Sequence, residues 1–267
     1  MDDIEQKWNR IFWRSLVLCG CLGIIFAEAV YFGWGVPVGC ANADLLPQEL
    51  LAAEASTDTP APQEKVVYLT FDDGPSSTTE LVLDVLKEKG VRATFFVVSA
   101  DCNQKHLPTL ARTVAEGHVV GLHSHSHEYS DIYKSDDAFW NDIDRLRYAI
   151  APYGCGNSML LRFPGGSTNT VSRRYGGSEL MTKLKAEAVE KGYRCFDWNV
   201  CGEDAVGNHP DASEIYSNVV RGASGKAVCV VLLHDTAATR NSAAALPQIV
   251  EWFQNAGYRF DTLDNQP

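Results

Sequence analysis

Short apolar runs alternate along the chain with longer segments in which apolar residues recur every three or four positions. The short runs are rich in β-branched and aromatic residues, which is typical of buried strands, and the longer segments have the spacing of amphipathic helices. The pattern predicts strands at Val66–Phe71, Ala93–Val98, His118–Leu122, Met159–Phe163, Tyr193–Asn199, Ala227–Leu233 and Tyr258–Leu263.

Six helices are expected between these strands, and four of them end one residue before a glycine, the usual left-handed cap. Strands that alternate with helices form a parallel sheet, because each crossover helix returns the chain to the same edge. At this length the commonest form is a closed or nearly closed (β/α) barrel, here of about seven parallel strands. The helices are predicted at Thr79–Lys89, Leu107–Glu116, Ala138–Ile150, Ser178–Lys191, Asp211–Arg221 and Ala244–Ala256.

The N-terminal part of the chain has the charge pattern of a membrane-directed segment. Residues 1–14 carry three basic side chains and precede an apolar run, residues 15–39, which only Glu28 interrupts. Positive charge before such a run predicts a cytoplasmic N-terminus and an extracytoplasmic body. Residues 15–39 then act either as a retained signal anchor, which holds the protein on the membrane, or as a signal peptide cut after Ala43, which releases it.

The next segment separates this apolar run from the periodic pattern. Residues 40–65 are rich in Ala, Pro, Glu, Ser and Thr, the composition of a flexible linker. The strand and helix pattern begins at Val66, so residues 66–267 are predicted to form the folded domain. The whole chain of 267 residues has room for one domain of enzyme size with an appendage.

Composition excludes several classes of protein. The chain has 23 Lys and Arg against 34 Asp and Glu, a net charge of −11, which excludes a general nucleic-acid-binding surface. A hydrophobic content of 45% excludes a wholly disordered chain. No C-x-x-C motif occurs, which excludes the usual zinc clamp and dithiol redox pair. We expect small buried apolar side chains, with at most one disulfide, for the domain's cysteines Cys102, Cys155, Cys195, Cys201 and Cys229.

Polar groups follow five of the predicted strands. Barrel enzymes place their reactive side chains at these carboxyl ends, so the groups are expected to meet at one rim. Each group alone has an ordinary explanation, such as a turn for Asp-Asp-Gly-Pro, but their coincidence at one rim predicts an active site. The groups are Asp72-Asp73-Gly74-Pro75, His123-Ser124-His125-Ser126-His127, Arg162-Phe163-Pro164-Gly165, Trp198 with Asp204, and Leu232-Leu233-His234.

In order and separation these groups resemble the five motifs of the polysaccharide deacetylase family, carbohydrate esterase family 4 with its NodB-like domain. The resemblance covers residues 66–267. It implies a distorted (β/α) barrel and one divalent metal ion, usually zinc, which activates water to remove N-acetyl groups from a polymer containing GlcNAc or MurNAc. The expected substrate is cell-wall glycan, above all peptidoglycan. The alternatives are an O-acetyl esterase, a chitooligosaccharide deacetylase and a catalytically silent glycan-binding module.

The resemblance also assigns the metal and base residues. Asp73, His123 and His127 match the metal ligands, a set that leaves positions open for water and for a substrate carbonyl. Asp72 matches the general base, and Arg162 matches the residue that keeps it ionised and oriented. Neighbouring residues of an extended chain point to opposite sides, so the two carboxylates are not expected to bind one metal face.

The remaining matches supply the acid and the acetyl pocket. His234 matches the general acid that protonates the leaving nitrogen, and Asp204 matches the carboxylate that keeps it charged. The Gly165 backbone N–H matches the donor that stabilises the oxyanion. Trp198 and Leu232 match the walls of the acetyl pocket.

The sequence departs from the family pattern at two motifs, and one motif leaves an alternative open. Many members have Tyr where this chain has Gly165, and the fourth motif, Cys201-Gly202-Glu203-Asp204-Ala205, lacks an Asp and a Trp. The walls of the acetyl pocket are therefore expected to differ from those of other members. If the residues from His123 to His127 were extended, His125 would join both as a three-histidine site, which would leave Asp73 unused.

Overall fold

The computed structural model describes residues 64–207 and 210–266. The predicted cytoplasmic residues 1–14, the apolar segment 15–39 and most of the linker at residues 40–65 lie outside the described residues. Within the described part of the chain, no helix has the length and apolar character needed to cross a membrane.

Eight strands of the described chain form one parallel sheet, in the order β5-β4-β3-β2-β1-β7-β6, with β8 paired to β1 outside this path. The central strand β1 pairs along its whole length with β7, which places Asp72 beside His234 at the carboxyl end. The parallel α/β organisation predicted from the sequence is confirmed. The strands are β1 Val66–Asp72, β2 Thr94–Val98, β3 Val119–Ser124, β4 Leu160–Leu161, β5 Arg194–Cys195, β6 Val200–Cys201, β7 Val228–His234 and β8 Arg259–Asp261.

The strand predicted at Tyr193–Asn199 is wrong in its extent. Only Arg194–Cys195 of this range forms a strand, β5; residues 196–199 then lead to β6, Val200–Cys201, which lies at the opposite end of the strand order. Asn199, just before β6, bonds to β7 through its side chain as well as its backbone. The side chain accepts from the Val230 N–H at 2.8 Å and donates to the Val228 carbonyl at 2.9 Å, and the Asn199 backbone N–H donates to the Val230 carbonyl at 3.1 Å. The barrel is therefore open between β5 and β6, and only the connecting chain spans the gap.

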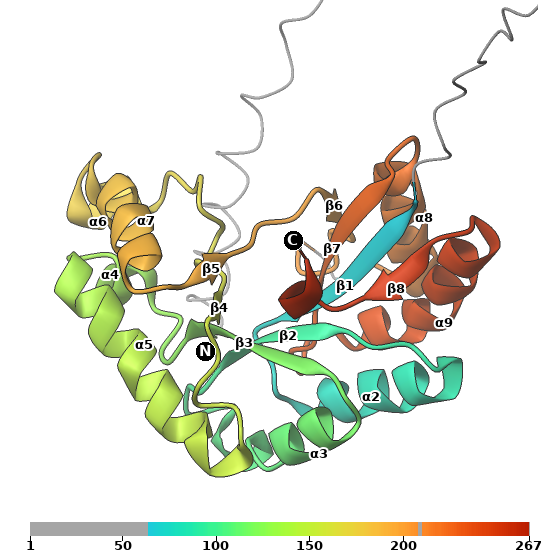
Figure 1. The fold of residues 1–267 in the computed structure, drawn as a ribbon, viewed down its shortest axis with the longest axis horizontal. Helices are drawn as coiled ribbons and strands as arrows, with labels where there is room; N and C mark the ends of the chain where they lie inside the picture. The colour runs from blue at the N-terminus through green and yellow to red at the C-terminus, as the bar shows by residue number, and fades with distance from the viewer. Residues whose placement is uncertain (1–63, 208–209, 267) are drawn as a thin grey trace, which may run out of the picture. The chain divides into compact units, whose positions relative to one another are not determined.

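Helices surround the strands on the outside of the open barrel (Figure 1). All six predicted helices are present with shifted ends, and each buries one apolar face against the sheet or a neighbouring helix. Two helices of four and five residues, α4 and α6, were not predicted because they are too short to show a helical period. The helices are α2 Ser77–Lys89, α3 Thr109–Ala115, α4 Tyr129–Ile132, α5 Asp136–Ile150, α6 Ser172–Gly176, α7 Leu180–Glu190, α8 Ala212–Ala223 and α9 Arg240–Asn255.

The five cysteines of the domain are free thiols in the structure. Cys155 and Cys229 are buried, and burial raises the pKa of Cys155 to about 11. The expectation of small buried side chains is wrong for Cys102 and Cys195, which are exposed.

Candidate active site

The carboxyl ends of the strands bring all five motifs to one rim of the sheet. Asp72 is the last residue of β1, His123 lies near the end of β3, and His234 ends β7. Asp72 is hydrogen-bonded in register with Phe96 on one side and His234 on the other. The parallel sheet thus places residues that are far apart in the sequence around one point.

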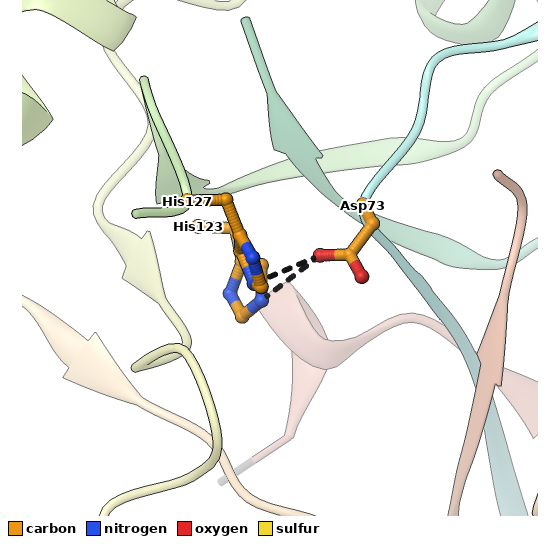
Figure 2. A group of neighbouring side chains, drawn as sticks. All are labelled: Asp73, His123 and His127. Atoms are coloured by element: carbon orange, nitrogen blue, oxygen red, sulfur yellow. Dashed lines mark ion pairs between the residues drawn. The ribbon is translucent and has the colours of Figure 1, made fainter. Parts of the chain in front are cut away.

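Asp73, His123 and His127 form a group whose ligand atoms lie within 4.8 Å of one another. Asp73 Oδ1 lies 3.4 Å from His123 Nε2 and 3.2 Å from His127 Nε2. Figure 2 shows both imidazoles facing this carboxylate, with dashed lines for the two ion pairs. This oxygen is buried and has no hydrogen-bond partner. Such a carboxylate oxygen, facing two imidazole nitrogens from one side, fits a divalent cation that accepts electron pairs from all three.

The tautomer of His123 strengthens this conclusion. Its Nδ1–H donates to the Arg162 carbonyl oxygen at 2.7 Å, which leaves an electron pair on Nε2 directed at Asp73. Burial lowers the pKa of His123 and favours this neutral form. Burial opposes ionisation of Asp73, but the neighbouring imidazoles of His127, His123 and His234 lower its pKa overall.

Two left-handed backbone conformations bring these ligands together. Asp73 has a φ of 71° and His127 a φ of 57°, a region that residues other than glycine adopt rarely. The chain therefore leaves the extended conformation at Asp73, and Asp72 Oδ2 still lies 3.9 Å from His123 Nε2. Asp72 nevertheless lies outside the group of three ligand atoms, as expected from the sequence.

The loop between the two ligand histidines is neither a helical turn nor an extended strand. The imidazole centroids of His123 and His127 are 5.2 Å apart. His125 points away from them, and its Nδ1 lies 2.8 Å from the buried Ser99 Oγ. The structure thus places His125 outside the group of side chains that could hold a metal ion, and Asp73 inside it.

The base candidate Asp72 is 3% exposed and is held by the fully buried Arg162. Arg162 Nη1 donates to Asp72 Oδ1 at 2.7 Å and to Thr70 Oγ1 at 2.8 Å. The buried guanidinium therefore fixes the position of the Asp72 carboxylate at the end of β1.

Arg162 also supports the open side of the barrel. Its Nε donates to the Phe196 carbonyl at 3.0 Å and its Nη2 to the Asp197 carbonyl at 3.3 Å. The guanidinium carbon lies 4.2 Å from the Phe96 ring centroid and 5.7 Å from that of Trp198. One side chain therefore positions both the base candidate and the segment that carries Trp198.

The acid candidate His234 is paired with the buried carboxylate of Asp204. His234 Nδ1–H donates to Asp204 Oδ1 at 2.9 Å, and the His234 backbone N–H donates to Oδ2 at 2.7 Å. Ser242 Oγ donates to the same Oδ2 at 2.5 Å. Burial lowers the pKa of His234, but the charge and hydrogen bond of Asp204 outweigh it and raise this pKa to about 10. The imidazole is therefore protonated at neutral pH and can act as an acid.

The loop around Gly165 explains one departure from the family pattern. Gly165 has a φ of 78°, and a Cβ there would lie 3.0 Å from Tyr129 Oη. Tyr129, which sequence reasoning missed, packs its ring against that of His127 with centroids 5.5 Å apart. A side chain at position 165 would thus press against Tyr129, which would have to shift slightly. Because this contact joins distant segments, no local sequence signal indicates it.

The other pocket residues lie close to this loop. A Cβ on Gly166 would lie 3.2 Å from Trp198 Cη2, so the glycine leaves room for the indole. Leu232 is buried on β7, in register with Cys201 of β6. The predicted wall residues Trp198 and Leu232 therefore lie on two elements that adjoin the rim.

Asp235 is a second titratable residue to which sequence reasoning gave no role. Its Oδ2 accepts from Thr79 Oγ1 at 2.6 Å, whereas its buried Oδ1 has no partner. Burial raises the pKa of Asp235 to about 7. A Cβ on Gly74 would lie 2.2 Å from this carboxylate, so only glycine fits there. Asp235 thus packs against the turn that follows Asp73.

Comparison with known proteins identifies relatives of the chain. Residues 59–180, which include the first three motifs, match the family model described as polysaccharide deacetylase. A peptidoglycan-N-acetylglucosamine deacetylase of Bacillus cereus is 34% identical over 209 residues, covering 76% of this chain and 71% of that protein. A putative polysaccharide deacetylase of Bacillus subtilis is 31% identical and covers 76% of this chain and 68% of that protein.

Solved structures show the same similarity. The catalytic domain of peptidoglycan N-acetylglucosamine deacetylase from Eubacterium rectale superposes with a TM-score of 0.72 and is 38% identical. The match covers 80% of this chain and 94% of that domain. A polysaccharide deacetylase from Bacillus cereus has a TM-score of 0.64 at 33% identity, covering 76% of this chain and 94% of the other.

Proposed function

Because the chain belongs to the polysaccharide deacetylase family, we propose that it removes N-acetyl groups from N-acetylglucosamine residues of peptidoglycan with the help of a bound zinc ion. Its membership makes the chain a hydrolytic enzyme. The choice of peptidoglycan is supported by relatives whose names specify that substrate and by the close likeness of their folds.

One observation carries the proposal. A base candidate held by a buried arginine and an acid candidate held by a buried aspartate occupy adjacent strands, beside three converging metal-ligand atoms. A glycan-binding module needs neither the base nor the acid. Hydrolysis of an amide needs both, because water must lose a proton and the leaving nitrogen must gain one.

The residues that would hold the metal are Asp73, His123 and His127. Two imidazoles and a carboxylate are a common donor set for hydrolytic zinc. When bound, the ion supplies Lewis acidity, which lowers the pKa of water and polarises the acetyl carbonyl.

The chain's own groups perform the proton transfers. Asp72, held in place by Arg162, accepts the proton of the attacking water. The Gly165 backbone N–H donates a hydrogen bond to the oxyanion that develops on the acetyl carbonyl. His234, charged through Asp204, donates its Nε2 proton to the sugar nitrogen as the carbon–nitrogen bond breaks. Trp198 and Leu232 provide apolar walls for the acetyl methyl group.

The proposal places the catalytic domain outside the cytoplasm, held on the membrane by the N-terminal segment. The three basic side chains in residues 1–14, followed by the apolar run, support this orientation. Alkaline phosphatase fused after Pro62 should be active, and the enzyme should stay with membranes after an alkaline wash. Mature protein that begins near Asp44 would instead indicate a cleaved signal peptide and a secreted enzyme.

Deacetylation is tested with the purified full chain in detergent. The metal is removed with a chelator, and acetate release and product mass are followed on peptidoglycan fragments, chitooligosaccharides and an O-acetylated glycan. We expect no activity without metal, recovery with one equivalent of zinc, and the fastest release from peptidoglycan fragments. The variant His127→Ala should not recover at one equivalent.

The other outcomes are equally informative. Faster release from chitooligosaccharides or from the O-acetylated glycan would assign one of those substrates instead. Full activity of the metal-free chain would remove the metal from the proposal. Binding of glycan with no acetate release under any metal would identify a silent binding module.

A further inference from the structure

A carboxylate outside the five motifs organises the loop that carries both ligand histidines. Asp142 lies on α5 and is 6% exposed. Its Oδ2 accepts from Ser124 Oγ at 2.6 Å and from the His125 N–H at 2.7 Å. Its Oδ1 accepts from the Ser126 N–H at 3.0 Å and from Ser126 Oγ at 2.8 Å. Three consecutive residues of the loop are therefore bonded to one side chain.

These four hydrogen bonds explain how the Asp142 carboxylate can be buried. Within the described residues, no Lys, Arg or His nitrogen lies within 4.0 Å of the Asp142 carboxylate. A buried carboxylate without an ion-pair partner is costly unless its oxygens are saturated with hydrogen bonds. The loop supplies these donors, so the position of the carboxylate and the path of the loop depend on each other.

The bonds continue from Asp142 to a ligand histidine. Ser124 Oγ, which donates to Asp142, accepts from the His127 N–H at 2.8 Å. His127 has a left-handed φ of 57°, a strained conformation for a residue other than glycine that persists only where the surroundings impose it. The chain of bonds from Asp142 through Ser124 holds this conformation, in which Nε2 faces Asp73.

The same bonds direct the middle histidine away from the ligand group. The His125 N–H points into the protein toward Asp142, and its ring lies against Ser99. An extended loop would instead place His123, His125 and His127 on one side. The bonds to Asp142 are thus present in a structure in which Asp73, and not His125, joins His123 and His127. The sequence alone leaves both ligand sets open.

We propose that Asp142 is a positioning residue that sets the affinity and the composition of the metal site by bonding the loop between His123 and His127. It does not touch the ion or the substrate. The inference rests on the proposed metal-dependent function. Removal of an outer partner of this kind typically weakens metal binding about 10–100-fold.

The test compares Asp142→Asn with Asp144→Asn in the full chain. Both variants remove one negative charge from α5, but Asp144 is exposed on the same helix and bonds no part of the loop. Asparagine at 142 keeps one acceptor oxygen and turns an NH₂ group toward two donors. Zinc dissociation constants are measured by competition with a chromophoric chelator at a temperature where circular dichroism shows each metal-free variant folded.

We expect Asp142→Asn to weaken zinc binding about 10–100-fold, whereas Asp144→Asn stays within about twofold of the parent. A merely structural role would lower the melting temperature of the metal-free protein and leave the dissociation constant of the folded protein unchanged. Equal affinity of Asp142→Asn and the parent therefore overturns the inference.

A second variant covers the case in which Asp142→Asn does not fold. Ser124→Ala removes the hydroxyl that links Asp142 to the His127 N–H, and should weaken zinc binding in the same direction. Unchanged affinity of Ser124→Ala would also overturn the inference. If the parent itself binds no zinc, the proposed metal-dependent function fails; if the parent binds zinc and these variants match it, only the role of Asp142 fails.

Discussion

Two histidines at opposite ends of the sheet, the buried His118 and the half-buried His234, have their pKa values shifted in opposite directions. His118, at the amino end just before β3, accepts a hydrogen bond from the Ala93 N–H at 3.2 Å and contacts the Phe95 ring edge. Burial lowers the pKa of His118 to about 4. At the carboxyl rim, Asp204 raises the pKa of His234 to about 10 despite burial.

The difference shows what separates a structural end of this barrel from a reactive end. Apolar surroundings and a backbone N–H donor favour the neutral form of the His118 imidazole, which has only a structural role. A buried carboxylate that is itself saturated by Ser242 and a backbone N–H selects the charged imidazole, which can give up a proton. The partner, rather than the extent of burial, determines which role a histidine takes.

The largest expected effect tests the reactive end. His234→Ala and Asp72→Asn should each lower kcat/KM by roughly 10²–10⁴-fold, because each removes one positioned proton transfer. Zinc content should stay near that of the parent, since neither residue belongs to the Asp73 group. Steady-state deacetylation with metal analysis in parallel measures both quantities. Full activity of His234→Ala would exclude it as the acid.

Asp204→Asn tests whether the carboxylate is the source of the charge on His234. The parent should show a bell-shaped pH dependence of kcat/KM, with the alkaline limb reporting proton loss from the His234 imidazolium. Removal of the negative charge lowers the pKa of His234, so activity should disappear at a pH about 1–3 units lower. A pH–rate profile of both proteins measures this. An alkaline limb that stays in place would assign it to another group.

His118→Asn tests the structural end. The unfolded histidine has a pKa of 6.5 and the folded one about 4, so between these values only the unfolded chain is protonated. Stability of the parent should therefore fall by about 3 kcal/mol as pH drops from 6.5 to 4. Asparagine offers an acceptor to the Ala93 N–H but does not titrate, so denaturant unfolding should show a shallower acid loss. Equal pH slopes for variant and parent would contradict this assignment.

The smallest effect is expected from a comparison of two glycines with left-handed backbone conformations, one at the carboxyl end of the sheet and one at its amino end. Gly165→Ala should lower stability by about 1–2 kcal/mol for its φ of 78°. It should also lower activity, because the added Cβ would press on Tyr129 beside the oxyanion donor.

The matched control is Gly192→Ala, between α7 and β5. Gly192 has a φ of 81°, and an added Cβ would meet only Met159 Cε at 3.7 Å. The control should cost similar stability in a melting experiment and leave deacetylation unchanged. Equal loss of activity in both variants would show that backbone strain, and not the contact with Tyr129, is responsible.

Much of the fold could be predicted from local pattern. The helical period and glycine caps located six helices, and the long buried strands β1, β2 and β7 were found close to their true bounds. The segment from Tyr193 to Asn199 was predicted as one strand, but only Arg194–Cys195 forms one, and β6 begins just beyond the segment at Val200. The positions of β4 and β7, with which β5 and β6 pair, determine where these two strands lie.

The candidate site was predicted only in part: the motif residues were found, but the residues that support them were not. The motif residues are recognisable in the sequence because each stands at a strand end, and the structure brings them together at the rim. Asp142, Tyr129 and Asp235 were missed as functional or supporting residues. Each acts through contacts with residues distant in the chain or with a loop backbone, and no periodicity or spacing reports such contacts.

By itself the sequence determined the alternation of strands and helices, the rim to which reactive groups belong and the chemical types available there, because these follow from local preferences and side-chain chemistry. Only the tertiary structure decided that Asp73 joins His123 and His127 while His125 turns to Ser99. It alone made the His118 imidazole neutral and the His234 imidazole positively charged at neutral pH. Backbone dihedrals at a turn and pKa values depend on neighbours brought together by folding, and these neighbours lie far away along the chain.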